Sequence, residues 1–299
     1  MADSKVVLIT GTSTGIGADT ARELAARGHH VIATMRNPDR DGPRVQAGFE
    51  ANMDVTRCDV TDQSSIDAAF ALTQEKYGRL DALVNNAGYT TYGAVLEQTE
   101  EEVHRVFDTN LYGVIRMMRA AAPIMRESGG GKILNVTSIA ARLIGPLFGV
   151  YCATKTGLEA VSEATRYELA RHGIQVCLVA PGIVKTDNQW RSFDTSGAFN
   201  DGVSEYQETM QGMLDEVRKV ASGRPGGRLN AVQMADLIEI DEQPLPLRVP
   251  VGEDTIRAFA NRAAMSDDEW ETMLWTTDQE GYPFGFFKNE RAARAQHFG

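Results

Sequence analysis

Tyr151 and Lys155 stand four residues apart in the segment YCATK, a spacing that could place an acid or base beside a cation. On a helix, positions i and i+4 lie on one face, so the Lys155 ammonium can approach the Tyr151 phenol. Free tyrosine has a pKa of about 10, too high for proton transfer near neutrality, and a nearby cation stabilises its phenolate. The pair could therefore exchange a proton with a carbonyl or alcohol oxygen.

Ser138 ends the apolar segment KILNVTS (132–138), upstream of Tyr151. Its hydroxyl can donate a hydrogen bond to a substrate oxygen on which charge develops during hydride transfer. A Tyr-x-x-x-Lys pair alone is most often an exposed pair on a helix, so its other companions in the sequence decide the interpretation. Residues 152–154 are expected to lie off the catalytic face, because successive helical residues turn by about 100°.

The segment TGTSTGIG (10–17) is a glycine-rich turn that could bind phosphate groups. It follows a β-branched apolar run and precedes IGADTARELAARG (16–28), which has helical periodicity. Gly11 permits a tight turn, Gly15 allows a ligand to come close, and Gly17 allows the helix to pack on the sheet. The helix N-terminus then directs N–H groups toward a pyrophosphate. The GxxxGxG spacing differs from the commoner GxGxxG.

Short apolar runs alternate with longer amphipathic segments along most of the chain. Strand-like runs fall at 5–10, 30–35, 53–60, 80–88, 132–138, 174–182 and 246–252. Helical periodicity is found at 16–28, 63–77, 99–127, 151–171 and 230–240. Crossover connections of this kind join parallel strands, and runs this apolar indicate burial on both faces. We therefore predict an α/β fold, a doubly wound parallel sheet of the Rossmann type.

The chain is predicted to be a single domain with a C-terminal extension. Residues 1–252 would form the domain, with a partly helical substrate lid within 186–228 that ends in SGRPGGR. Residues 253–299 are rich in charged and aromatic side chains. We expect this extension to pack on the same domain or on a partner subunit.

The composition limits the possible partners. A formal net charge of −11 repels polyanions, so neither nucleic acid nor a membrane surface is an expected partner. No run reaches the roughly 18 apolar residues of a membrane helix, and the N-terminus lacks the pattern of a signal peptide, so we expect a cytoplasmic protein. Cys58, Cys152 and Cys177 have neither metal-binding nor disulfide spacing. No metal site is predicted.

These motifs together resemble the short-chain dehydrogenase/reductase family over roughly residues 5–250. The nucleotide turn matches the pattern TGxxxGIG, and the other matches occur in the family's order. They are NNAG (85–88), Asn110, Ser138, Tyr151 with Lys155, and PG (181–182) with Thr186. The segments IATMRNP, SIAARLIGP and LRVPVG are most similar to the 17β-hydroxysteroid-dehydrogenase-like branch.

The resemblance implies an NAD(P)-dependent oxidoreductase and assigns roles to individual residues. The implied catalytic residues are Asn110, Ser138, Tyr151 and Lys155. The Asn110 position is associated with a helix distortion and a bound water, and the Lys155 ammonium with the nicotinamide ribose. The residues implied to bind the dinucleotide are Gly11, Ser13, Thr14, Gly15, Ile16, Gly17, Met35, Arg36, Asp59, Val60, Asn86, Ala87, Gly88, Tyr151, Lys155, Pro181, Gly182, Ile183 and Thr186.

The end of the second strand indicates which dinucleotide is used. An acidic residue there would favour NAD, whereas arginine accommodates the extra phosphate of NADP. The sequence has Thr34, Met35 and Arg36, so NADP(H) is favoured over NAD(H). The glycine turn itself lacks the basic residue that many NADP-preferring relatives have. Asp59 either contacts adenine or caps the following helix.

The substrate is predicted to be a small molecule with a hydrophobic or aromatic carbonyl or alcohol. Apolar residues of the 139–149 loop and the lid would bound its pocket: Leu143, Ile144, Leu147, Phe148 and Trp190. A catalytically silent dinucleotide-binding sensor or scaffold is the alternative, although such a protein would not need Tyr151. An epimerase or dehydratase of nucleotide-linked sugars is disfavoured by the short lid. The resemblance also implies a homodimer or homotetramer, formed through the helices 99–127 and 151–171.

Overall fold

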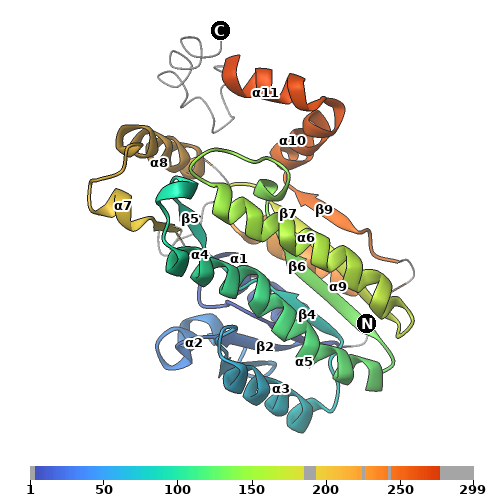
Figure 1. Cartoon of the computed structure of the whole chain (residues 1–299). Coiled ribbons are helices and arrows are strands. Elements are labelled where there is room, and N and C mark those ends of the chain that lie inside the picture. Colours follow the sequence, from blue (N-terminus) through green and yellow to red (C-terminus); the bar gives the residue numbers. More distant parts are fainter. Residues whose placement is uncertain (1–3, 185–192, 224–225, 242–243, 277–299) are drawn as a thin grey trace.

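A parallel sheet of seven strands forms the centre of the protein (Figure 1). The computed structural model describes residues 4–184, 193–223, 226–241 and 244–276. In spatial order the strands are β3 (Met53–Arg57), β2 (His30–Met35), β1 (Val6–Ile9), β4 (Ala82–Asn85), β6 (Gly131–Val136), β7 (Ile174–Pro181) and β9 (Arg248–Val251). Every neighbouring pair in this sheet is parallel. The doubly wound parallel sheet predicted from the sequence is therefore confirmed.

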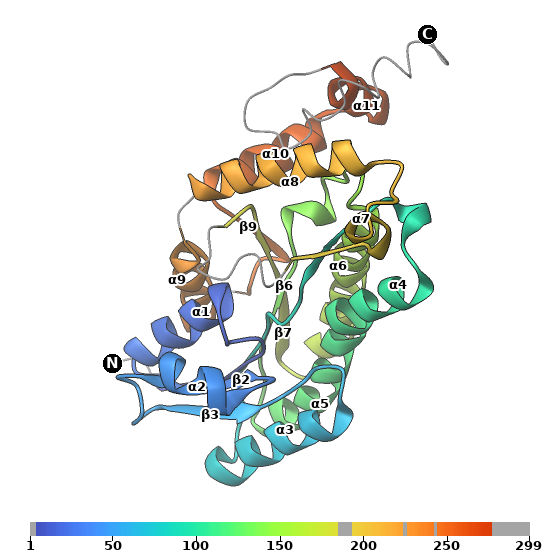
Figure 2. The ribbon, with the colours of Figure 1, turned by 90° about the vertical axis from the view of Figure 1, so that its left-hand side faces the viewer.

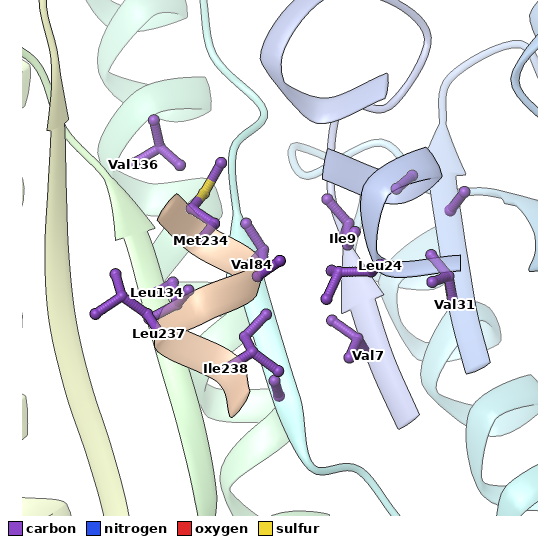
Figure 3. Close-up of a cluster of buried hydrophobic side chains, with 14 of the residues drawn as sticks. Val7, Ile9, Leu24, Val31, Val84, Leu134, Val136, Met234, Leu237 and Ile238 are labelled. Atoms are coloured by element: carbon purple, nitrogen blue, oxygen red, sulfur yellow. The ribbon is translucent and has the colours of Figure 1, made fainter. Parts of the chain in front are cut away.

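Helices cover both faces of the sheet. One face carries α1 (Gly15–Ala26), α2 (Pro38–Gln46) and α9 (Arg228–Glu239), and the other carries α3 (Gln63–Tyr77), α5 (Gly113–Glu127) and α6 (Gly149–Ala170). Side chains alternate between the two cores: Val7 and Ile9 of β1 join the first, whereas Val6 and Leu8 join the second. Figure 3 shows Leu24 of α1 and the apolar face of α9 against the strands in the first core.

The direction of winding reverses between β1 and β4. From β1 the chain proceeds outward through β2 to β3, and then returns to β4 on the other side of β1. The connections leave the sheet in opposite directions at this point, which opens a crevice at the carboxyl ends of the strands. Ligands of doubly wound proteins bind in such a crevice.

The helix predicted at 99–127 is interrupted by a π-helical turn. It consists of α4 (Glu100–Phe107), the π-helix η2 (Asp108–Tyr112) and α5. Thr99 begins α4 with a capping box, because its side chain accepts from the Glu102 amide and the Glu102 carboxylate accepts from the Thr99 amide. The wider turn contains Asn110, and single π turns of this kind are frequent at functional sites.

A group of short elements lies at the end of the molecule where the predicted lid begins. The strands β5 (Thr90–Tyr92) and β8 (Phe193–Thr195) form a separate parallel pair. The other elements of this region are η1 (Val95–Glu97), η3 (Ile139–Ala141), α7 (Gly197–Asn200) and α8 (Gln207–Ser222). Buried side chains of α8, among them Met213 and Val217, pack with Tyr92 and Leu147.

The C-terminal extension continues with two helices, α10 (Glu253–Ala264) and α11 (Asp267–Thr276), at the same end of the molecule as α8 (Figures 1 and 2). Trp270 is buried against Leu143 and Ala258, and the Arg262 guanidinium lies 5.4 Å from its ring centroid. The aromatic residues of the tail from Tyr282 onward lie outside the described residues. No helix in the described part of the chain is long and apolar enough to cross a membrane.

Candidate active site

One cavity of about 910 Å³ extends across the carboxyl ends of the strands at the reversal point. Most residues predicted to bind a dinucleotide or to act in catalysis line it. They are Gly11, Ser13, Thr14, Gly15, Ile16, Met35, Arg36, Asp59, Val60, Asn86, Ala87, Gly88, Ser138, Tyr151, Lys155, Pro181, Gly182 and Ile183. Gly17 and Asn110 do not line the cavity. Thr186 and Trp190 lie outside the described residues.

The glycine turn is built for close contact with a ligand. Gly11 has a φ of 70°, and an added Cβ would lie 2.7 Å from the Ala87 Cα, so only glycine fits. Gly17 packs on Gly11 and Asn86 within the protein instead of on a ligand. The Thr14 side chain does not cap α1, which leaves the first amides of this helix for another acceptor. These features fit the pyrophosphate of a dinucleotide.

Thr10 joins the turn to the end of β4, a role that the sequence did not reveal. Its hydroxyl accepts hydrogen bonds of 3.0 Å from the amides of Asn86 and Ala87. The Asn86 side chain donates in return to the carbonyls of Thr10 and Gly11, at 3.0 and 3.1 Å. The side-chain amide of Asn86 therefore fixes the turn through its NH₂ group.

Basic residues border the cavity beyond β2. Arg36 is exposed and lines the cavity, as does Arg40, which pairs with Asp41 at 2.7 Å. Arg44 donates to the Ser13 carbonyl in the glycine turn. Arg40 and Arg44 belong to α2, a helix that the sequence pattern does not predict. This end of the cavity therefore has two guanidinium groups in its wall, and that of Arg40 is paired with Asp41, which lines the cavity as well.

Asp59 lines the cavity and does not cap the following helix. Its carboxylate accepts from the amide and hydroxyl of Thr61, at 3.0 and 2.8 Å. Asp62 is the residue that caps α3, through a 3.0 Å hydrogen bond from the Ser64 amide. The capping alternative for Asp59 is wrong, because α3 begins at Gln63.

Tyr151 and Lys155 occupy the first turns of α6 and are both buried. The Lys155 ammonium lies 5.8 Å from the centroid of the Tyr151 ring and donates to the Val136 carbonyl at 3.0 Å. Ser138 follows β6, and its hydroxyl accepts from the Ala140 amide at 3.1 Å. A hydroxyl, a phenol and an ammonium thus meet on one wall of the cavity.

Burial affects the two titratable groups of this wall in opposite directions. It raises the pKa of Tyr151, and hydrogen bonds with Ser138 and Thr90 act to lower that pKa. It lowers the pKa of Lys155 to about 8. Lys155 therefore keeps its charge at neutral pH and loses it in mildly alkaline solution. Thr90, at the start of β5, was not among the residues that the sequence singled out.

Asn110 lies behind the cavity wall, in the π-helical turn. Its side chain donates to the Tyr89 carbonyl at 2.8 Å and accepts from the Tyr89 amide at 3.0 Å. It also donates to the Thr154 hydroxyl at 3.2 Å. Thr154 faces away from the cavity, as predicted for residues 152–154, but it holds Asn110. The observed π turn is the helix distortion that the family resemblance implied.

A buried carboxylate holds the segment that follows Ser138. Glu159, two turns after Tyr151 on α6, accepts from Arg142 at 2.9 Å and from Arg248 at 3.0 and 2.8 Å. Arg142 follows η3, and Arg248 begins β9. The three residues join the turn after Ser138 to the helix of Tyr151 and to the edge of the sheet.

Apolar side chains from the segment after Ser138, from α8 and from α10 form another wall of the cavity. This wall consists of Leu143, Pro146, Phe148, Met213, Val217 and Ala258. Two residues predicted for this pocket lie elsewhere: Ile144 is 47% exposed, and Leu147 packs against α8. Met213 and Val217 come from α8, and Ala258 from α10. Asp254 and Arg257 of α10 line the same cavity.

Comparisons with known proteins agree with this geometry. Residues 5–197 match the family model described as short chain dehydrogenase. The uncharacterized oxidoreductase YusZ of Bacillus subtilis (strain 168) is 32% identical over 280 residues, which are 91% of this chain and 98% of that protein. A short-chain dehydrogenase from Streptomyces avermitilis has a TM-score of 0.74 at 31% identity, covering 93% of this chain and 100% of that one. ElxO, solved with NADP bound, has a TM-score of 0.70 at 25% identity, covering 85% and 99%.

Proposed function

Because the chain belongs to the short-chain dehydrogenase family, we propose that it transfers hydride between NADP(H) and a carbonyl or secondary alcohol of a hydrophobic or aromatic substrate. The protein is an oxidoreductase of this family and therefore an enzyme. The observation that carries the proposal is a single cavity whose wall includes the glycine turn, Ser138, Tyr151 and Lys155.

Proton transfer in this proposal belongs to Tyr151. A nicotinamide bound in the cavity would supply or accept the hydride. In the reducing direction the Tyr151 phenol gives its proton to the carbonyl oxygen, and in the oxidising direction the phenolate takes it from the alcohol. Ser138 donates a hydrogen bond to the same oxygen, where negative charge develops. The Lys155 ammonium stabilises the phenolate and would also hold the ribose of a bound nicotinamide nucleotide.

The preference for NADP(H) is supported by the charges at the end of β2. Arg36 lines the cavity where an NAD-binding protein would have a carboxylate, and Arg40 lines it nearby. Guanidinium groups bind phosphate oxygens strongly because they can donate two parallel hydrogen bonds. Comparing kcat/KM for NADPH and NADH tests this preference, and a higher value for NADH would overturn it.

The apolar wall supports a bulky apolar substrate. The side chains of Phe148, Met213 and Val217 would remove its carbon skeleton from water and leave the reacting oxygen beside Tyr151. A series of ketones that differ in size and polarity tests this point. Bulky apolar ketones should be reduced with higher kcat/KM than small polar ketones or sugars, and the opposite order would exclude the proposed substrate class.

The domain division, the assembly and the cellular location are also proposed from the sequence. Residues 1–252 would form the catalytic domain, and 253–299 would cover it or meet a partner subunit. A homodimer or homotetramer in the cytoplasm is proposed, and light scattering after size-exclusion chromatography tests the assembly. Membership of the 17β-hydroxysteroid-dehydrogenase-like branch stays a prediction and does not imply a steroid substrate.

The experiment that tests the function is a panel of carbonyl and alcohol substrates with NADPH and NADH. It is run on the wild-type protein and on Tyr151→Phe, which keeps the ring and loses the hydroxyl. We expect the wild type to turn over several apolar ketones and the variant to bind the dinucleotide without turnover. Equal turnover by both proteins would remove Tyr151 from the proposed chemistry.

A further inference from the structure

We propose that Thr90 is a third hydroxyl of the acid/base centre, which donates a hydrogen bond to Tyr151 from β5 while Ser138 serves the substrate oxygen. The inference rests on the proposed function, because it adds a residue to the proposed proton-transfer site. It gives β5 a role in the chemistry in addition to its pairing with β8.

The geometry of β5 directs Thr90 toward Tyr151. Residues i and i+2 of a strand point to the same side, so Thr90 and Tyr92 share one face of β5 and Thr91 faces the other way. Both Thr90 and Tyr92 line the cavity. The Tyr92 ring stacks on Phe148, with centroids 4.8 Å apart and planes 13° apart. Phe148 in turn lies 4.8 Å from the Tyr151 ring, at 31°. The face of β5 that carries Thr90 is therefore the face turned to Tyr151.

The backbone around Thr90 is held from several sides. Asn110 binds both the amide and the carbonyl of Tyr89, the residue before Thr90. At the other end of β5, the Tyr92 carbonyl accepts from the Ser196 amide at 2.8 Å, and the Gly93 amide donates to the Leu147 carbonyl at 2.8 Å. These contacts hold the backbone of β5 on both sides of Thr90.

Ser138 would have to donate to two oxygen atoms, those of Tyr151 and of the substrate, so a second hydrogen-bond donor is useful. A serine hydroxyl has one hydrogen to donate, so Ser138 cannot donate to the phenolate and to the substrate oxygen at the same time. When a substrate is bound, the Thr90 hydroxyl can keep a hydrogen bond to Tyr151 that Ser138 has given up. Burial raises the pKa of Tyr151, and hydrogen bonds with both hydroxyls act to lower it. Loss of the Thr90 donor should therefore raise the pKa further.

Other titratable groups near Tyr151 do not change when Thr90 is replaced. Lys155 and Cys152 lie on the same helix, and the pKa of the Cys152 thiol is raised by burial to about 11. Tyr92 faces Tyr151 from β5, and burial also raises its pKa. From α10, Asp254 and Arg257 line the cavity, whereas α8 contributes only the uncharged Met213 and Val217. Asp194 of β8, the strand that pairs with β5, lines the cavity too, together with its ion-pair partner Arg105 of α4. A shift caused by replacing Thr90 would thus report on its hydroxyl.

Two near-isosteric variants test the proposal, Thr90→Val and the matched control Thr91→Val on the opposite face of β5. Tyrosine labelled with carbon-13 at Cζ reports the ionisation of Tyr151 in the NADP⁺ complex without any turnover, and the Tyr151→Phe spectrum identifies its signal. The pH profile of alcohol oxidation gives a second midpoint for the ionisation of Tyr151. We expect Thr90→Val to raise both midpoints by about 0.5–1 pH unit, and Thr91→Val and Thr90→Ser to leave them unchanged.

The outcomes separate this inference from the proposed function. Equal midpoints in Thr90→Val and Thr91→Val, or a shift in Thr90→Ser as large as in Thr90→Val, would overturn the role of Thr90. Turnover by Tyr151→Phe would overturn the proposed function, and the titration of the labelled tyrosine would still decide whether Thr90 binds it. Melting temperatures of the variants show whether each protein is folded.

Discussion

The carboxylate of Glu159 offers a direct test of how the site is held together. Glu159→Gln keeps the size of the side chain and removes its charge. The two guanidinium groups of Arg142 and Arg248 converge on this carboxylate through three hydrogen bonds of 2.8–3.0 Å. A glutamine offers one acceptor oxygen, and its amide would face N–H donors of one arginine. If the glutamine oxygen takes the place of Oε2, it keeps one hydrogen bond to each arginine, but its NH₂ group faces the Nε–H of Arg248. Both guanidinium groups lose the negative charge of the carboxylate.

The expected loss of stability follows from the exposure of the three side chains. The Glu159 side chain is 6% exposed and that of Arg248 is 20% exposed, so this pair is largely withdrawn from water. Hydrogen bonds to charged groups contribute about 1.5–3 kcal/mol each at such sites. Arg142 is 47% exposed, so its pair is weighted as a surface ion pair of about 0–1 kcal/mol. We expect the free energy of unfolding to fall by about 2–3 kcal/mol, which lowers the melting temperature of a chain of 299 residues by roughly 3–5 °C.

The assay is thermal and urea unfolding of the wild type, Glu159→Gln and a matched control. Glu168→Gln serves as the control, because it makes the same change at an exposed position of α6. The control should stay within about 0.5 kcal/mol of the wild type. A melting temperature of Glu159→Gln equal to that of Glu168→Gln would refute the reasoning that this carboxylate joins the segment after Ser138 to α6 and β9.

Three further predictions concern the dinucleotide. Gly11→Ala should abolish NADPH binding in fluorescence titrations, because the new methyl group would overlap the Ala87 backbone. The control Gly212→Ala should preserve binding, because no atom lies within 4 Å of the added methyl group. Unchanged binding in Gly11→Ala would count against the proposed turn. Arg36→Ala should lower kcat/KM for NADPH by about 10- to 100-fold and leave that for NADH unchanged, and equal losses with both would exclude a contact with the extra phosphate. Since burial lowers the pKa of Lys155 to about 8, its ammonium is present below that pH and lost above it, so NADPH binding should weaken as the pH rises through about 8. NADPH binding by Lys155→Met should not change with pH in this range. A pH dependence that persists in this variant would have to come from another titratable group.

Local patterns were sufficient to predict the architecture. Each of the seven predicted strand-like runs overlaps a strand of the main sheet, and His30–Met35 has the predicted ends. The helix of Tyr151 and Lys155 was predicted as well, since its periodicity extends over many turns. Hydrophobic periodicity depends on residues that are close together in the sequence, so it can be recognised without the structure. The predicted roles of the residues in this site stay predictions.

Features that depend on contacts between distant segments were not predictable. The helix α2 has the sequence PDRDGPRVQ, in which glycine and an internal proline oppose helix formation, so its arginines were missed. The strand β5 has only three residues and is defined by its pairing with β8, a hundred residues later in the chain. Thr90 could therefore not be connected with Tyr151. Periodicity does not reveal the π-helical turn around Asn110 either, and only the family resemblance implied a distortion of the helix there.

The measurement that tests the central claim most directly compares chemistry with binding in Tyr151→Phe. Single-turnover oxidation of NADPH in the presence of a bulky apolar ketone gives the rate of hydride transfer, and fluorescence titration gives the Kd of NADPH for the same protein. We predict a loss of about 10²- to 10⁴-fold in the rate, the range expected for removal of a general acid, with a nearly unchanged Kd. A rate close to that of the wild type, with NADPH bound equally well, would contradict the assignment of Tyr151 as the proton donor.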